Sequence, residues 1–153
     1  MKNFIKFLFL LSFLFTFSQD YELEIIYEKI DDNSYKIKNS SNNIIGFLKF
    51  NRLNKKEFRY FNKNNELVAK EVLTSENEVW MFPFDLKTLT EVLDLLGEPI
   101  YTRDWNEKQG RFNIFLDGEQ LGYLKNNKSI NQWEFFKNRN LEINAYTSIF
   151  EIK

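Results

Sequence analysis

Two hydrophobic patterns follow one another at the beginning of the chain. Residues 7–17 form an apolar run that only Ser12 and Thr16 interrupt. Over residues 21–28 the pattern changes, and apolar side chains at every second position alternate mostly with glutamates. A period of two is typical of a β-strand with one face toward water. The first pattern predicts a leader segment, and the second indicates the beginning of a β-rich domain.

The leader has the features of a secretory signal peptide. Lys2 and Lys6 give a positive start, and residues 16–18 place small side chains where a signal peptidase cleaves. The apolar run is shorter than the about 20 residues that a membrane-spanning helix needs. We therefore predict a signal peptide over residues 1–18, a secreted or periplasmic mature protein beginning at Gln19, and no membrane span after cleavage.

Two later segments resemble each other. Residues 45–49 and 121–125 both read aliphatic, Gly, aromatic, Leu, Lys, and aromatic runs at 58–61 and 133–136 follow them at nearly the same separation. Such self-similarity predicts duplicated architecture, although two aromatic-rich hairpins can also match by coincidence. We predict a single β-rich domain over residues 19–153. Its repeat-like halves, about 21–72 and 99–152, would be joined by a helical segment at 73–98.

Turn residues predict hairpins within these halves. Asp117-Gly118 lies between two apolar runs, and both residue types tolerate the positive φ that a two-residue hairpin requires. Residues 62–65 are a looser turn of the same kind. Gly46 and Gly122 lie within predicted strands, where glycine often marks a bulge or a close backbone approach.

One helix is predicted between the halves, over about residues 86–96. Asp85 is a candidate N-cap, and Gly97 and Pro99 would end the helix. Its apolar stripe has helical spacing and should be buried against the sheet; it comprises Leu86, Leu89, Val92, Leu93 and Leu96. The fold class is therefore mainly β (α+β): two antiparallel β-meanders packed as a curved sheet or barrel with one central helix.

The segment from Leu95 to Pro99, leading into Tyr101–Trp105, resembles the helix-to-strand turn of small bacterial envelope proteins. These are the outer-membrane-assembly small-protein-A type and the related β-lactamase-inhibitor fold. The resemblance implies a helix that ends in Leu-Gly-x-Pro before an aromatic antiparallel sheet. The paired hairpins are also similar to tubby-like barrels, in which strands surround one helix. Neither resemblance implies a functional residue here.

Composition excludes several kinds of chemistry. The chain has no Cys and no His, which excludes disulfides, thiolate or imidazole metal sites, and catalytic systems built on histidine or cysteine. We predict no cofactor, no metal and no catalytic residue. Removal of the leader with its two lysines leaves 19 of the 21 basic residues against 22 acidic ones, a net charge of −3. This mild balance does not point to nucleic acid.

Candidate binding residues come from two aromatic segments, and they are Trp80, Phe82, Asp104, Trp105, Glu107 and Arg111. Residues 80–84 are a short aromatic-rich segment that could be an exposed binding patch or could pack within the domain against the start of the predicted helix, as a hydrophobic staple does. Asp104 and Glu107 could flank a sugar as the two carboxylates of a glycosidase, or simply belong to a charged strand end, which is the interpretation that we favour.

These observations favour an exported, non-catalytic binding or interaction protein of the bacterial envelope or extracellular space, with a protein or glycan partner. The abundance of Asn, Lys, Ile and Phe is typical of an AT-rich bacterial genome. Two alternatives stay open: a carboxylate-dependent glycan hydrolase that uses Asp104 and Glu107, and a small inhibitor or immunity protein. A cleft with two convergent carboxylates would favour the hydrolase.

Overall fold

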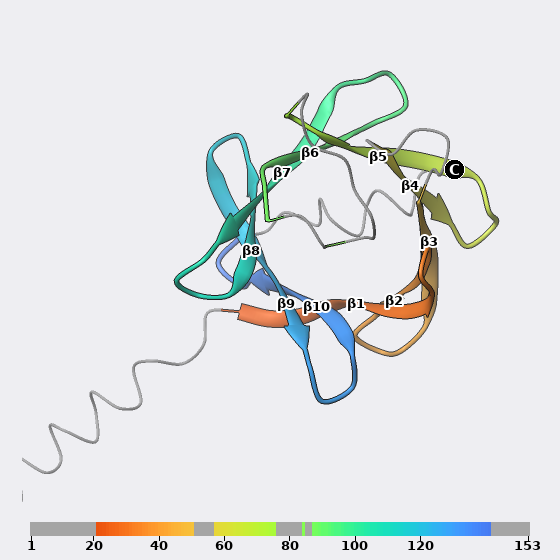
Figure 1. The fold of residues 1–153 in the computed structure, drawn as a ribbon, viewed down its shortest axis with the longest axis horizontal. Coiled ribbons are helices and arrows are strands. Elements are labelled where there is room, and N and C mark those ends of the chain that lie inside the picture. Colours follow the sequence, from red (N-terminus) through yellow and green to blue (C-terminus); the bar gives the residue numbers. More distant parts are fainter. Residues whose placement is uncertain (1–20, 51–56, 76–83, 85–86, 142–153) are drawn as a thin grey trace, which may run out of the picture.

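The computed structural model describes residues 21–50, 57–75, 84 and 87–141. Within these residues the chain forms a closed antiparallel barrel, in which each strand pairs with its neighbour in sequence and β1 closes the ring against β10 (Figure 1). The strands are β1 (Tyr21–Asp31), β2 (Ser34–Asn39), β3 (Ile44–Phe50), β4 (Glu57–Asn62), β5 (Leu67–Leu73), β6 (Thr90–Leu93), β7 (Pro99–Asn106), β8 (Arg111–Leu116), β9 (Glu119–Asn127) and β10 (Gln132–Asn138). The prediction of a mainly β, antiparallel fold is confirmed, and the barrel is one of its two predicted forms.

The alternation of side chains along each strand builds the core. In β2, for example, Tyr35 and Ile37 are buried inside the barrel while Lys36 lies on the outer face. A ring of ten strands encloses more space than small aliphatic side chains can fill, and large aromatic residues occupy much of it. The largest of these are less than 2 % exposed: Tyr27, Phe58, Tyr60, Phe112 and Phe135.

Phe84 adds to this core from the connection between β5 and β6. Its ring centroid lies 5.4 Å from those of Tyr27 and Tyr35 and 5.0 Å from that of Trp133, and only 6 % of the residue is exposed. The high aromatic content of the sequence is thus used to fill a wide barrel.

Both strand glycines lie next to a β-bulge. In the β2–β3 pair the register shifts between Ile37 and Lys38, so that Ile45 is the extra residue beside Gly46. In the β8–β9 pair the shift leaves Leu121 as the extra residue beside Gly122. A Cβ atom at Gly122 would lie 2.1 Å from the carbonyl oxygen of Phe136, so this close approach requires glycine.

The register around these bulges is the same in both halves. One row of directly paired residues crosses β1 to β4, and an equivalent row crosses β7 to β10. The rows are Tyr27–Ile37–Gly46–Asn62 and Arg103–Ile114–Gly122–Lys137. Duplication of the whole halves, 21–72 and 99–152, stays a prediction because residues 142–152 lie outside the described part of the chain.

The predicted helix over residues 86–96 is wrong. Residues 90–93 form β6 instead, in which Thr90 and Val92 are buried. Leu89 is 41 % exposed and Leu96 is 88 % exposed, so the apolar stripe does not share one buried face. A strand is favoured here because β5 and β7 each present an edge whose backbone groups need partners. Asp85 and Leu86 lie outside the described residues.

The resemblance to helix-to-strand turns fails for the same reason, because Leu95–Pro99 connects one strand to another. The predicted signal peptide, residues 1–18, lies outside the described part of the chain. Among the residues that the structure does describe, no helix has the length and apolar character needed to cross a membrane.

Candidate functional site

A cluster of buried polar groups lies inside the barrel where β5, β6 and β7 run side by side. Glu71 is 1 % exposed and Arg103 is 2 % exposed, and Arg103 Nη2 lies 2.6 Å from Glu71 Oε1. Thr90 Oγ1 donates to Glu71 Oε1 at 2.7 Å, and Tyr60 OH donates to Glu71 Oε2 at 2.8 Å. Both oxygens of this carboxylate are therefore engaged by side chains of the barrel.

Aromatic rings enclose the guanidinium of Arg103. Its Cζ lies 4.8 Å from the ring centroid of Phe84 and 4.6 Å from that of Phe112, distances at which a cation–π interaction is favourable. A buried charge is tolerated when it is paired and hydrogen-bonded. We assign this cluster, consisting of Glu71, Thr90, Tyr60 and Arg103, a structural role as the polar core that joins β4, β5, β6 and β7.

The structure separates the residues of the predicted site. Asp104 is exposed on the outer face of β7, where it pairs with Asn113 of β8. The neighbouring Trp105 has the opposite orientation and packs against the core, with its ring centroid 4.8 Å from that of Phe112. Glu107 is exposed in the β7–β8 turn. A sugar-stacking platform beside the Asp104 carboxylate would have to lie on the same face of β7 as Asp104. Trp105 lies on the opposite face.

Arg111 belongs to a different surface, an aromatic cluster on the outer wall formed by β1, β8, β9 and β10. Its Cζ lies 3.9 Å from the ring centroid of Tyr123, and the Tyr123 ring stacks on that of Phe136 with a centroid separation of 5.1 Å. Burial raises the pKa of the Tyr123 hydroxyl, although the charge of Arg111 opposes this effect. Cross-strand packing accounts for these contacts.

Trp80 and Phe82 lie outside the described residues, so their predicted place in a binding surface is not tested. Lys87, which follows them in the chain, has its Nζ 4.9 Å from the ring centroid of Trp105. Among the described residues there is no group of three or more Asp or Glu side chains that could hold a metal ion.

Three hairpin turns at one end of the barrel share the same construction. In each, the side-chain oxygen of an Asn or Asp accepts the backbone N–H four residues later, and the residue before that donor has positive φ. The three pairs are Asn39–Asn43 at 2.9 Å, Asn62–Glu66 at 3.0 Å and Asp94–Glu98 at 2.9 Å; the positive-φ residues are Asn42, Asn65 and Gly97. The side chain thus replaces a backbone partner and fixes each turn.

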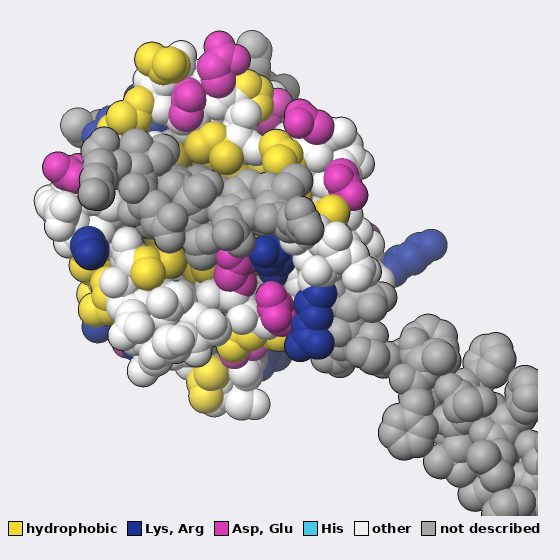
Figure 2. All heavy atoms as spheres, turned by 180° about the vertical axis from the view of Figure 1, so that it is seen from behind, with side chains coloured by type: hydrophobic (Ala, Val, Ile, Leu, Met, Phe, Trp, Pro, Cys, Tyr) yellow, Lys and Arg dark blue, Asp and Glu magenta, His cyan; other side chains and the backbone are white. Residues whose placement is uncertain are grey.

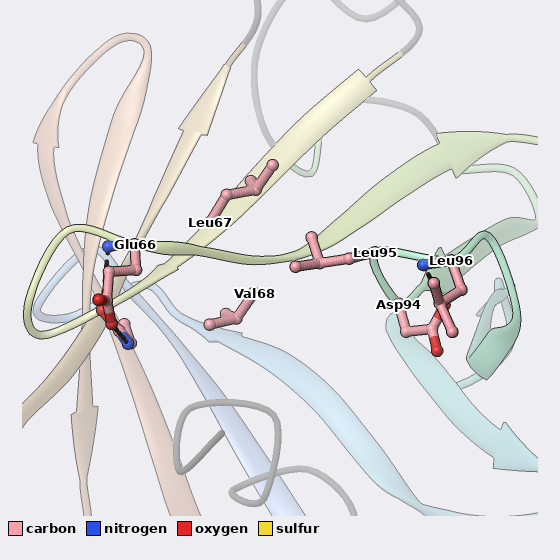
Figure 3. A pocket seen from close by; sticks show the side chains of 7 residues that line it. Glu66, Leu67, Val68, Asp94, Leu95 and Leu96 are labelled. Carbon is pink, nitrogen blue, oxygen red and sulfur yellow. Dashed lines mark hydrogen bonds between the residues drawn. The ribbon is translucent and has the colours of Figure 1, made fainter. Parts of the chain in front are cut away.

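Two of these turns border a pocket of about 340 Å³. Figure 3 shows Glu66 at one side of it and Asp94 with Leu96 at the other, with Leu67, Val68 and Leu95 between them. We call this the rim pocket; its lining residues are Asn62, Glu66, Leu67, Val68, Asp94, Leu95 and Leu96. It combines an apolar centre with a carboxylate at each side.

The leucines of the β6–β7 turn are unusually exposed, at 58 % for Leu95 and 88 % for Leu96. This hairpin projects from the upper edge of the barrel in Figure 1, and Figure 2 shows hydrophobic side chains next to acidic ones along that edge. Asp94 Oδ1 accepts a hydrogen bond from the backbone N–H of Leu96 at 2.8 Å. The turn that exposes these leucines is therefore stabilised by a hydrogen bond of its own.

No protein-family model matches the chain, and no curated protein or solved structure is significantly similar to it. The site must therefore be interpreted from its own geometry.

The sequence contains a signal for the rim pocket that the prediction missed. Residues 62–66 and 94–98 both begin with Asn or Asp, have Asn or Gly at the fourth position, and end with Glu. The first pattern predicts a turn, whereas the two leucines and the Gly-x-Pro of the second segment favour a helix end. Comparison of the two segments would have indicated a second turn.

Proposed function

We propose that this chain is an exported, non-catalytic binding protein of the bacterial envelope or extracellular space, and that it recognises its partner through the rim pocket. The observation that carries the proposal is the exposure of Leu95 and Leu96 on a braced turn beside an apolar pocket. Exposed apolar groups that are held beside a concave surface are typical of interaction sites.

The contrast with the other polar groups supports a binding function. Inside the barrel, Glu71 is fully engaged by Arg103, Thr90 and Tyr60. At the other end of β7, Asp104 and Glu107 are exposed, with Trp105 turned toward the core. The hydrolase alternative needs two carboxylates that flank one substrate, and this arrangement gives it less support than the rim pocket gives to binding.

Affinity capture from periplasmic and secreted fractions of the native host tests the proposal. We expect the tagged mature chain to retain a partner that a Leu95→Asn/Leu96→Asn variant loses. Ile30→Asn/Ile130→Asn is the matched control, because these residues are 48 % and 54 % exposed and lie at the opposite end of the barrel. Equal capture by all three proteins, or none by any, would overturn the proposal.

The export part of the proposal has its own measurement. Intact mass spectrometry of the protein from its native host should give a mature chain that begins at or within a few residues of Gln19. A soluble cytoplasmic protein that retains residues 1–18 would contradict export while leaving the rim pocket open to the capture experiment.

A further inference from the structure

The rim pocket has a charge pattern that restricts what can bind there. Glu66 and Asp94 lie at opposite sides of its apolar centre (Figure 3). Among the described residues, neither carboxylate forms an ion pair with a basic side chain: the ion pairs present involve other acidic groups. Lys49 contacts the β4–β5 turn that contains Glu66, but its Nζ donates to Asn65 Oδ1 at 2.6 Å and lies over the Phe61 ring.

The contacts that these two carboxylates do make hold their own turns. Glu66 Oε2 accepts from Asn62 Nδ2 at 2.7 Å, and Asp94 Oδ1 accepts two backbone N–H groups at 2.8 and 2.9 Å. These donors are neutral, so within the described part of the chain the two negative charges are held in place by hydrogen bonds and have no ion-pair partner. A partner that places cations beside them gains electrostatic complementarity as well as apolar contact.

We propose that the rim pocket binds a peptide segment of a partner protein in which an aliphatic side chain is flanked by lysine or arginine. This inference rests on the proposed function. The aliphatic group would pack among Leu67, Val68 and Leu95, and the flanking cations would lie beside Glu66 and Asp94. An acidic segment would be repelled from the same surface. This selectivity separates the proposal from general hydrophobic adhesion.

Fluorescence polarisation with defined peptides tests this peptide-binding inference. The probes are short labelled peptides with a central leucine and a lysine on either side, the same peptides with glutamate for lysine, and a third set with serine for leucine. We expect the full mature chain to bind the lysine–leucine set most tightly. Binding should weaken when salt is raised from about 0.05 M to about 0.5 M, because the contacts lie at the surface.

The decisive variant is Glu66→Gln/Asp94→Asn. Each substitution retains the side-chain oxygen that accepts the turn hydrogen bonds, so the turns should persist while two charges are lost. Two partly exposed ion pairs correspond to a loss of about threefold to tenfold in affinity for the lysine peptides. Asp104→Asn/Glu107→Gln removes two exposed charges elsewhere and should leave the affinity unchanged. Unfolding by urea confirms that both variants fold.

Each result decides between the two proposals. Tight binding of the glutamate peptides, a lysine preference that persists in Glu66→Gln/Asp94→Asn, or no binding at about 1 mM peptide would overturn the peptide inference. If capture from the host still depends on Leu95 and Leu96, the proposed function survives that failure. If the peptides bind as expected but capture is independent of these leucines, the peptide site stands and the proposed function falls.

Discussion

Inside the barrel, the Glu71 carboxylate is 1 % exposed and is held by an arginine and two hydroxyl groups. At the rim, the donors to the Glu66 and Asp94 carboxylates among the described residues are neutral, and the pocket that they border includes the solvent-exposed Leu95 and Leu96. Both regions combine carboxylates with hydrophobic side chains. The difference teaches that burial demands compensation of charge, whereas a rim exposed to water can keep charge and apolar surface available for a partner.

The largest expected effect breaks the interior ion pair. Arg103→Met leaves the Glu71 carboxylate buried without its cation, and we expect it to lower the free energy of unfolding by about 3–5 kcal/mol. The double variant Glu71→Met/Arg103→Met should be less destabilised than Arg103→Met alone, because no charge is then left uncompensated. Urea unfolding followed by tryptophan fluorescence measures both. An Arg103→Met protein as stable as the wild type would contradict the role assigned to this cluster.

The barrel wall and the rim also differ in their glycines. Gly122→Ala places a Cβ 2.1 Å from the Phe136 carbonyl oxygen, and we expect a loss of about 3 kcal/mol because the backbone must move. At Gly97 no atom lies within 4 Å of an added Cβ, so Gly97→Ala should cost only the strain of its positive φ, about 1 kcal/mol. Equal effects in urea unfolding would show that the two strands separate easily at Gly122.

A third pair compares two residues of the segment that was expected to be helical. Val92 is fully buried in β6, and Val92→Ala should lower the free energy of unfolding by about 2 kcal/mol, through lost transfer energy and the cavity left behind. Leu96 is 88 % exposed, and Leu96→Ala should change the free energy of unfolding by no more than about 0.5 kcal/mol. If Leu96→Ala proved the more damaging in urea unfolding, the strand and turn assignment would be wrong.

The smallest effect concerns an ion pair on the outer wall. Hydrogen bonding from Lys38 lowers the pKa of Glu28, burial opposes this, and the charges of Lys38 and Lys36 lower it further. Because the folded-state pKa lies below the ordinary value of 4.5, the stabilisation is present above pH 4.5 and is lost as the pH falls through the folded-state pKa. Glu28→Gln should cost at most about 0.5 kcal/mol at neutral pH.

A series of urea-unfolding measurements at different pH values tests this prediction for Glu28. Urea unfolding of the wild type and Glu28→Gln should give curves that converge at acid pH and separate as the pH rises. A difference that is largest at acid pH would have the opposite sign and would contradict the depressed pKa of Glu28.

The sequence by itself determined the class of the fold and much of its local geometry. The period of two across residues 21–28 predicted β1, and Asp117-Gly118 predicted a hairpin in which both residues indeed have positive φ. Gly46 and Gly122 indicated bulges or close approaches, and both lie next to bulges. These features depend on neighbouring residues, whose steric preferences act whatever the rest of the chain does.

Only the tertiary structure decided that residues 90–93 form a strand and that Leu95 and Leu96 face solvent. Apolar residues at 89, 92, 93 and 96 fit a helix by spacing alone, but closure of the barrel places this segment between two strand edges that need backbone partners. The pairing of Glu71 with Arg103, 32 positions apart along the chain, and the approach of two distant turns around one pocket likewise follow from strand order. No local pattern encodes that order, because it is set by which edges meet when the barrel closes.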